Sequence, residues 1–289
     1  MHDYAHPEVL VSTSWVAEHK DDPDVVLVEV DLESRSYRSG HVPGALSWSW
    51  ATQLCDQTVR EILPKAELEL LLSRSGIDPS TRVVLYGDHH NWFAAWAFWQ
   101  LRMFGHRALH LMNGGREKWI AEGRELTRKA ARPVPKIYRA KSPDFSQRAY
   151  LADARKASES GFAVLVDVRS REEYTGEWLA PPGFRETSQR GGHIPGAKSI
   201  PWNSACEPDG TFKSYEALKD LYQSNGVDGH LPVITYCRIG ERSSHTWFVL
   251  KYLLGYDSVR NYDGSWTEWG NLVGAAVERG EPRSPAGVA

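Results

Sequence analysis

The sequence predicts an α/β protein built from two similar domains, each a mostly parallel β-sheet flanked by helices. Short apolar strand patterns alternate with helical patterns along the chain, which is typical of parallel sheets covered by helices. The same order of motifs occurs twice within the 289 residues. A duplication of this length indicates two related domains rather than a solenoid.

The first part of the repeat is a strand followed by a turn motif. Val25–Asp31 reads as a buried strand and leads to Gly40-His41-Val42-Pro43-Gly44-Ala45. Val164–Arg169 has the same pattern and leads to Gly192-His193-Ile194-Pro195-Gly196-Ala197. The strands lie 138 residues apart and the turns 152 apart, which places an insertion of 14 residues within 175–190. Prolines and polar residues predict that this insertion is a surface loop.

The second part of the repeat aligns without a gap at an offset of 150 residues. Tyr86-Gly87-Asp88 matches Tyr236-Cys237-Arg238, and the match continues through Trp119 and Trp269. A stretch rich in proline and basic residues separates the two copies and reads as a linker. We therefore expect a first domain over 1–128, a linker over 129–145 and a second domain over 146–289.

Cys237 stands at a chemically distinctive position. The apolar segment Leu231–Thr235 precedes it and reads as a strand, and Ser244–Leu254 follows with a helical pattern closed by Gly255. Loop amides and the helix dipole can converge on such a sulfur. With Arg238 and Arg242 against Glu241, the loop carries one net positive charge. These effects favour a reactive thiolate, although a buried structural cysteine is the alternative.

The repeat supplies an internal control for this interpretation. The first copy has Gly87 where the second has Cys237, and its following residues, Asp88-His89-His90-Asn91-Trp92, lack the arginines. Only the second domain is therefore expected to be catalytic. His41 and His193 occur in both copies, so we interpret them as residues that fix the turns. The adjacent His89 and His90 are weak evidence for a metal site.

Composition limits the possible partners. The net charge of −3 and the pI of about 6.4 give no reason to expect nucleic acid or an anionic membrane as a partner. No apolar run reaches the length of a membrane span, and no secretory signal is visible at the N-terminus. Three cysteines do not form a disulfide framework, which suggests the reducing cytoplasm. Cys55 and Cys206 are expected to be inert, and no motif implies a metal or a dissociable cofactor.

Several motifs together resemble one family. The chain is similar to the tandem-domain rhodaneses, the thiosulfate and mercaptopyruvate sulfurtransferases, over nearly its whole length. The resemblance rests on both Gly-His-x-Pro-Gly-Ala turns, on the six-residue loop that begins at Cys237, and on two further motifs, Asn113–Trp119 and Asn261–Trp269. It implies two α/β domains with a catalytic cysteine only in the C-terminal one.

The resemblance also implies a reaction. Cys237 would attack the sulfane sulfur of thiosulfate, expel sulfite and become a persulfide, which cyanide or an acceptor thiol then discharges. Arg242 and Arg238 are the candidates for binding the sulfonate oxygens. The terminal sulfur of the persulfide would lie among the amides of the loop. The remaining loop residues expected to provide these amides are Ile239, Gly240, Glu241 and Ser243.

The chain departs from the family pattern at two places. Ile239 stands where the thiosulfate enzymes carry a basic residue, and Glu172-Glu173-Tyr174 stands where they carry an arginine. Mercaptopyruvate enzymes typically have small residues directly after the cysteine, which Arg238 does not match. Thiosulfate is therefore the favoured donor.

Three alternatives stay open at this point. The chain could be a 3-mercaptopyruvate sulfurtransferase, or a non-enzymatic sulfur carrier or regulatory module. Related phosphatases place five residues between the cysteine and the arginine, whereas four separate Cys237 from Arg242. The shorter loop suits one sulfur atom better than a phosphate, so a phosphatase is disfavoured.

Overall fold

The structure, a computed structural model, describes residues 3–182 and 188–281. The described chain divides into two compact units. The first unit contains 6–145 together with 206–213, and the second contains 3–5, 146–205 and 214–281. Residues 129–145, expected as a linker, thus group with the first unit. Each unit also includes a short segment from the other half of the sequence.

The first unit is a five-stranded parallel sheet with strand order β1-β5-β4-β2-β3. Its strands are β1 (Leu10–Val11), β2 (Val25–Asp31), β3 (Leu46–Ser49), β4 (Arg82–Tyr86) and β5 (Leu109–Met112). Its helices are α1 (Thr13–His19), α2 (Arg35–Ser39), α3 (Trp50–Gln53), α4 (Lys65–Arg74), α5 (Trp92–Met103) and α6 (Gly115–Ala121), with short 3₁₀ turns at Pro7–Val9 and His89–Asn91.

The second unit repeats this topology with strand order β6-β10-β9-β7-β8, again all parallel. Its strands are β6 (Arg148–Ala149), β7 (Val164–Asp167), β8 (Lys198–Ser199), β9 (Val233–Tyr236) and β10 (Val259–Tyr262). Its helices are α7 (Leu151–Ser160), α8 (Arg171–Thr175), α9 (Tyr215–Ser224), α10 (Glu241–Phe248) and α11 (Ser265–Trp269), with short turns at Phe145–Gln147 and Trp202–Ala205. The α/β fold with two tandem parallel sheets is confirmed.

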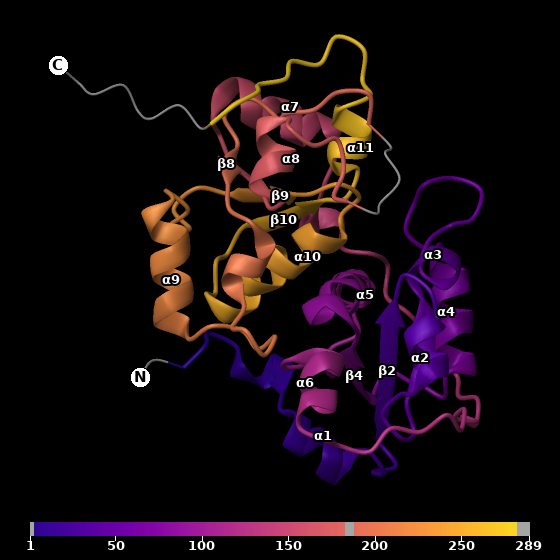
Figure 1. Ribbon diagram of the computed structural model, residues 1–289. Coiled ribbons are helices and arrows are strands. Elements are labelled where there is room, and N and C mark those ends of the chain that lie inside the picture. The colour runs from indigo at the N-terminus through magenta and orange to yellow at the C-terminus, as the bar shows by residue number, and fades with distance from the viewer. Residues whose placement is uncertain (1–2, 183–187, 282–289) are drawn as a thin grey trace, which may run out of the picture. The chain divides into compact units, whose positions relative to one another are not determined.

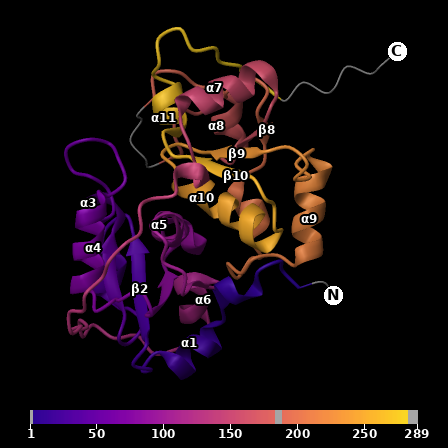
Figure 2. The same ribbon diagram turned by 180° about the vertical axis from the view of Figure 1, so that it is seen from behind.

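Helices cover both faces of the second sheet. Figure 1 shows α7, α8 and α11 on one side of β9 and β10, with α10 on the other, and Figure 2 shows the same order from behind. Ala154, Tyr174 and Trp266 from the first three helices join strand residues in one buried cluster. All eight residues of α10 are buried, whereas Arg238 and Ile239 in the loop before it are only partly buried.

The predicted bounds of a central strand agree with the structure, whereas the predicted start of the helix after Cys237 does not. β2 has the predicted bounds, Val25–Asp31. The helix expected from Ser244 instead begins at Glu241, because Gly240 has a left-handed φ of 103° and serves as the N-cap. It continues as a π-helical turn over Val249–Leu253 before Gly255. The earlier start brings Glu241 and Arg242 into the first helical turn.

The two Gly-His-x-Pro-Gly-Ala turns are held in the same way. His41 stacks on Tyr37 and His193 stacks on Tyr174, each with ring centroids 3.6 Å apart and planes 7° apart. The Nδ1 atom of each histidine lies 2.9 or 2.8 Å from the carbonyl oxygen of the same tyrosine. Both histidines are therefore structural in this fold, as the repeat suggested.

The insertion over 175–190 is described only in part, since residues 183–187 lie outside the described residues. Arg190 ends it and anchors the chain that follows α11. Its guanidinium donates to the carbonyl oxygens of Trp269, Gly270, Leu272 and Ala275 at 2.6–2.9 Å. One side chain thus satisfies several carbonyls beyond the last helical turn.

Segments from the other half of the sequence complete each unit. In the first unit, the Asn113 side-chain oxygen accepts a hydrogen bond from the amide of Phe212 at 3.0 Å, and Lys118 pairs with Asp209 at 2.7 Å. In the second unit, the amide of Ala5 donates to the carbonyl of Leu253 at 2.9 Å. These bonds give both exchanged segments defined positions within their units.

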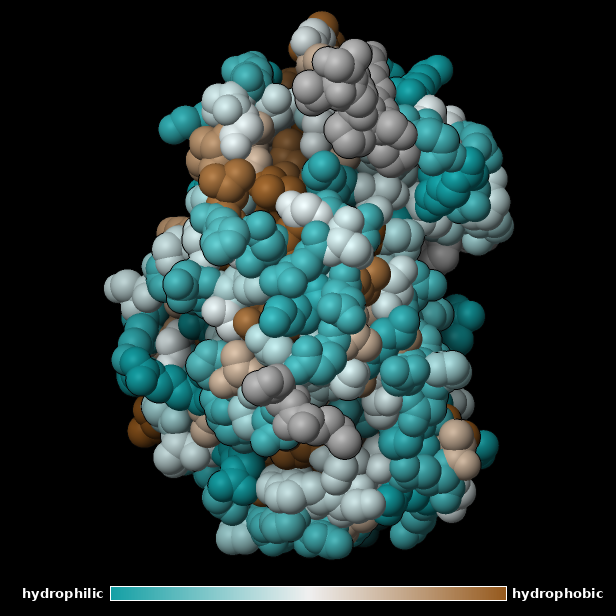
Figure 3. Space-filling view, turned by 90° about the vertical axis from the view of Figure 1, so that its left-hand side faces the viewer, coloured by the Kyte–Doolittle hydropathy of each residue, from teal (hydrophilic) through white to brown (hydrophobic). Residues whose placement is uncertain are grey.

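Hydrophilic and hydrophobic side chains are both visible at the surface in Figure 3. Figure 3 shows one face, on which hydrophilic side chains dominate, in keeping with the charged fraction of 25%. Among residues 3–182 and 188–281, no helix is both long and apolar enough to cross a membrane.

We predict that Gly192→Ala destabilises the protein far more than Gly196→Ala. Both glycines have positive φ, 115° and 79°, so strain of about 1 kcal/mol applies to each. A Cβ at Gly192 would lie 2.2 Å from the Glu278 carbonyl oxygen, whereas one at Gly196 meets nothing within 4 Å. Gly192→Ala should cost more than about 3 kcal/mol in urea unfolding. Equal losses for the two variants would contradict this reading of the turn.

Candidate active site around Cys237

Cys237 directly follows β9 and begins the turn that leads into α10. Its side chain is fully buried. The turn is tight because Gly240 packs against the strand-end loop, where an added Cβ would lie 2.7 Å from the Cβ of Asp263. Asp263 is held there by a two-bond ion pair with Arg148, at 2.9 and 3.0 Å. The position after Ile239 therefore requires glycine both for its φ and for space.

Three polar groups surround the sulfur atom. The amide of Gly240 donates to Sγ at 3.2 Å, and the Glu241 Oε2 atom lies 3.5 Å from Sγ. The Ser243 hydroxyl lies 3.6 Å from Sγ and 2.6 Å from Oδ1 of Asn261. A hydroxyl has a single proton to donate, so Ser243 can serve the sulfur or Asn261 but not both.

The resting state of Cys237 differs from the sequence-based expectation. Burial raises the pKa of the thiol, and the negative charge of Glu241 raises it further, whereas Arg242 and Ser243 lower it. The net effect is a raised pKa, which opposes the expectation that the surroundings of Cys237 favour the thiolate. Net loop charge was a poor guide because it ignored desolvation of the sulfur and the closeness of Glu241.

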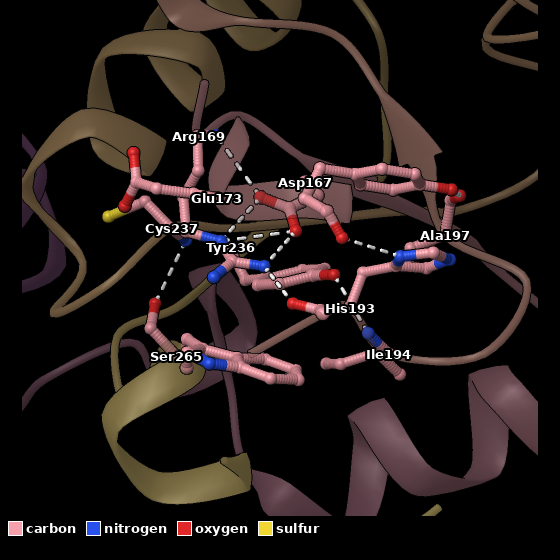
Figure 4. Close-up of polar contacts among 12 residues, drawn as sticks. Asp167, Arg169, Glu173, His193, Ile194, Ala197, Tyr236, Cys237 and Ser265 are labelled. Atoms are coloured by element: carbon pink, nitrogen blue, oxygen red, sulfur yellow. Dashed lines mark hydrogen bonds and ion pairs between the residues drawn. The ribbon is translucent and has the colours of Figure 1, made fainter. Parts of the chain in front are cut away.

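The loop before α11 holds the backbone of Cys237 in place. The Ser265 hydroxyl accepts a hydrogen bond from the Cys237 amide at 3.1 Å and donates to the Tyr262 carbonyl at 2.7 Å. The amide of Trp266 donates to the Cys237 carbonyl at 3.1 Å, and the amide of Thr267 to the Arg238 carbonyl at 3.0 Å. Figure 4 shows the Cys237 backbone facing Ser265 across this bond.

Ser265 has an unusual backbone conformation for this role. Its φ is 53°, in the left-handed region, and the matching residue of the first copy is Gly115 with φ of 58°. A serine here is strained by about 1 kcal/mol or more. The hydroxyl offsets this strain by satisfying the buried amide of Cys237, a bond that glycine could not supply.

We predict that Ser265→Ala is more destabilising than Ser265→Gly. Both changes leave the buried Cys237 amide without its acceptor, at a cost of about 1–3 kcal/mol. Alanine keeps the left-handed strain, whereas glycine relieves it, so the two should differ by about 1 kcal/mol in urea unfolding. A glycine variant as unstable as the alanine variant would show that strain is not stored at this position.

Arg242 faces an acidic partner from α8. Its Nη1 and Nη2 atoms bond the two carboxylate oxygens of Glu173 at 2.7 and 3.0 Å, and both side chains are almost fully buried. Burial raises the pKa of Glu173, but the hydrogen bonds and charge of Arg242 outweigh it, so the pKa lies below its usual value. Binding of sulfonate by Arg242 stays a prediction, and this ion pair instead favours a positioning role.

We predict that Arg242→Ala costs about 3–5 kcal/mol of folding stability, because it leaves the Glu173 charge buried and unpaired. An Arg242→Met/Glu173→Leu double variant should recover most of that loss. The pKa of Glu173 is lower folded than unfolded, so its contribution exists above about pH 4.3 and fades as pH falls through the folded value. Urea unfolding from about pH 2 to 7 tests both statements, and a pH-independent difference between wild type and double variant would refute the second.

A second buried ion pair, between Arg169 and Asp167, lies at the end of β7. Arg169 bonds Asp167 through Nε and Nη2, donates to the Gly192 carbonyl at 2.7 Å, and packs over the Trp266 ring at 4.6 Å. Figure 4 shows this pair beside Tyr236, whose hydroxyl accepts from the amide of Ile194. Asp167 and Arg169 thus join the strand end to the Gly-His-Ile-Pro-Gly-Ala turn.

The first unit contains a similar framework without the cysteine. Glu29 and Asp31 stand where the second copy has Asp167 and Arg169, and Arg116 stands in place of Trp266. Arg116 donates to the Gly40 carbonyl, the counterpart of Gly192. Burial, with Asp31 nearby, raises the pKa of Glu29 to about 8. Burial, with Asp88 nearby, likewise raises the pKa of Asp31 to about 7.

The remaining candidates belong to the first of the two units. Cys206 is buried, and burial raises its pKa to about 12. Cys55, His89 and His90 lie in the first unit. Within the described part of the chain, no group of three or more His, Cys, Asp or Glu residues is arranged to hold a metal ion.

Sequence reasoning missed four side chains that shape the site. Three of them lie outside the cysteine loop, and the fourth, Glu241, was expected to contribute only its amide and its share of the net charge of the loop. The one available signal was Ser265, which stands where the corresponding motif of the first copy has Gly115. The four are Glu173, Glu241, Asn261 and Ser265.

Comparison with known proteins agrees with the geometry. The model of the rhodanese-like domain matches residues 12–122 and again 150–272. The chain belongs to the rhodanese family.

Relatives of nearly the same length support this assignment. A Haloferax volcanii protein named "Putative thiosulfate sulfurtransferase" is 52% identical over 283 residues, covering 96% of this chain and 98% of that protein. The Thermus thermophilus protein named "Sulfur carrier protein TtuD" is 51% identical, covering 96% and 99%. A Mycolicibacterium smegmatis protein named as a "Putative thiosulfate sulfurtransferase" is 47% identical, covering 96% and 99%.

Solved structures are similar over most of the chain. The anaerobic ergothioneine biosynthesis enzyme from Chlorobium limicola, in complex with trimethyl histidine, matches with a TM-score of 0.84 and 25% identity, covering 98% of this chain and 72% of that one. An EanB variant in complex with ergothioneine covalently linked to a cysteine persulfide has the same TM-score, identity and coverage.

Proposed function

We propose that this rhodanese-family sulfurtransferase takes the sulfane sulfur of thiosulfate onto Cys237 and passes it to a thiol or to cyanide. The observation that carries the proposal is the polar nest around one buried sulfur atom. Gly240 N–H, the Ser243 hydroxyl and the N-terminus of the eight-residue helix α10 all face Sγ. Such groups stabilise negative charge on a sulfur without any metal ligand.

The chemistry has two half-reactions. The sulfur of Cys237, once deprotonated, attacks the outer sulfur of thiosulfate, and the S–S bond of the donor breaks with its electron pair leaving on sulfite. The resulting persulfide anion replaces the thiolate in the same nest. A nucleophile then attacks the terminal sulfur, which regenerates the Cys237 thiolate and releases the thiocyanate or acceptor persulfide.

Arg238 is the better placed candidate for the sulfonate group. Its side chain is partly exposed, whereas Arg242 is buried against Glu173. A guanidinium at the start of the loop offers paired donors to a tetrahedral anion. Arg242 would not contact the donor. Its ion pair with Glu173 would instead hold the first turn of α10 next to the sulfur.

Two other readings remain open to test. A 3-mercaptopyruvate donor would need a site for a carboxylate rather than a sulfonate. A sulfur carrier with a protein thiol as acceptor is supported by the printed name of the Thermus thermophilus relative, at 51% identity. Both readings use the same persulfide on Cys237, so they differ in donor or acceptor and not in the nucleophile.

We predict that Cys237→Ser abolishes sulfur transfer with little change in the fold, since the hydroxyl is a poor nucleophile of nearly the same size. Mass spectrometry after incubation with thiosulfate should show one added sulfur on the wild type and on Cys55→Ser, and none on Cys237→Ser. Specificity constants for thiosulfate, mercaptopyruvate and an aryl phosphate, measured in parallel, identify the donor class. Thiocyanate production by Cys237→Ser would refute the assignment of the nucleophile.

A further inference from the structure

Glu241 is a buried acid directed at the reactive sulfur. Its Oε2 atom lies 3.5 Å from Sγ of Cys237, within hydrogen-bond range for sulfur, and only 3% of the residue is exposed. Its other carboxylate oxygen is 3.6 Å from Nε of Arg242. A buried carboxylate is costly unless it is paired or takes up a proton, and the nearest proton is that of the thiol.

The charges around Glu241 leave this carboxylate weakly compensated. Arg242 gives its two terminal nitrogens to Glu173 on α8, so only Nε turns toward Glu241. Arg238 belongs to the same loop and is partly exposed.

The other charged groups packed against this region form pairs of their own. Behind Gly240, from the loop after β10, Asp263 is matched by Arg148 on β6. At the end of β7, Asp167 is matched by Arg169. Each of these pairs balances one positive against one negative charge. His245, one turn further along α10, is also buried. Within the couple of Cys237 and Glu241, a proton shift changes which atom carries the negative charge.

We propose that Glu241 accepts the proton of the Cys237 thiol during sulfur uptake, which makes it a catalytic residue of the reaction proposed above. Before the transfer the proton lies on sulfur, and the Glu241 Oε2 atom, 3.5 Å away, is positioned to accept it. Arrival of a dianionic donor disfavours loss of that proton to water, because a further negative charge would then be added to a buried site. Transfer of the proton to Glu241 leaves the total charge unchanged.

The step balances without an added reagent. The S–H bond of Cys237 breaks as an O–H bond forms on Glu241, and the sulfur pair attacks the outer sulfur of thiosulfate. The S–S bond of the donor breaks, and its electron pair leaves with sulfite. Thiol, carboxylate and thiosulfate dianion thus give persulfide anion, carboxylic acid and sulfite dianion, with three negative charges on each side. The carboxylic acid can then donate a hydrogen bond to the persulfide.

A proton-accepting role and a purely electrostatic role of Glu241 predict opposite changes in the transfer rate of Glu241→Gln at low pH. If Glu241 acted only through its charge, Glu241→Gln would remove a group that disfavours the thiolate, and transfer would become faster at low pH. If Glu241 accepts the proton, the glutamine variant must lose the thiol proton to water. Its rate would then depend on pH through the ionisation of the thiol itself.

The test is the single-turnover rate of persulfide formation at saturating thiosulfate, from about pH 5 to 9. We expect Glu241→Gln to be slower by on the order of tenfold or more near pH 6, with its acid limb shifted to higher pH and the rate recovering as pH rises. Glu159→Gln removes the same charge from an exposed site on α7 and should match the wild type. An unchanged or faster rate for Glu241→Gln near pH 6 overturns the proposal.

A further measurement separates this proposal from the function on which it rests. If the wild type gains no sulfur from thiosulfate, the proposed function fails, whatever Glu241 does. If the wild type gains sulfur and Glu241→Gln gains it equally fast, only the role of Glu241 fails. Should Glu241→Gln not fold by circular dichroism, Glu241→Asp carries the test. Its shorter side chain should slow transfer near pH 6, and an undiminished rate would refute the role.

Discussion

The site depends on the backbone clamp that fixes Cys237 at the end of β9. Ser265, Trp266 and Thr267 bond the amide of Cys237 and the carbonyls of Cys237 and Arg238, while Gly240 lets the chain turn under the sulfur. Parallel strands end at a common edge, so the loop after the neighbouring strand β10 is close enough to provide this clamp. With the backbone held in this way, the amide of Gly240, the carboxylate of Glu241 and the hydroxyl of Ser243 lie within 3.2–3.6 Å of the sulfur atom.

Duplication preserved this framework and changed its chemistry. Both units use a guanidinium to hold the glycine carbonyl of the Gly-His-x-Pro-Gly-Ala turn, from Arg169 in one and Arg116 in the other. In the first unit the change leaves two buried acids on one strand, Glu29 and Asp31. The two turns therefore have the same geometry although different residues hold them, whereas the cysteine occurs in only one copy.

The sequence was sufficient for the architecture and for singling out Cys237 as the candidate nucleophile, because both depend on local patterns. Strand periodicity and the repeat fixed the order of elements, and Cys237 was recognisable from one loop. The partners of that loop come from distant segments: Glu173 from α8, and Asn261 and Ser265 from β10 and beyond. The thiol's pKa was misjudged for a related reason, since burial of the sulfur and the direction of Glu241 are properties of packing. The net charge of the loop, counted from the sequence, gives no information on burial of the sulfur or on the direction of the Glu241 side chain.

The exchanged segments have a practical consequence for dissecting the protein. Phe212 and Asp209 supply bonds to the first unit, and Ala5 supplies one to the second. If the polypeptide were cut at the repeat boundary, the first unit would lose residues 206–213 and the second would lose residues 3–5. Each half expressed alone would then expose polar groups that the intact chain satisfies, so autonomous folding does not follow from the duplication.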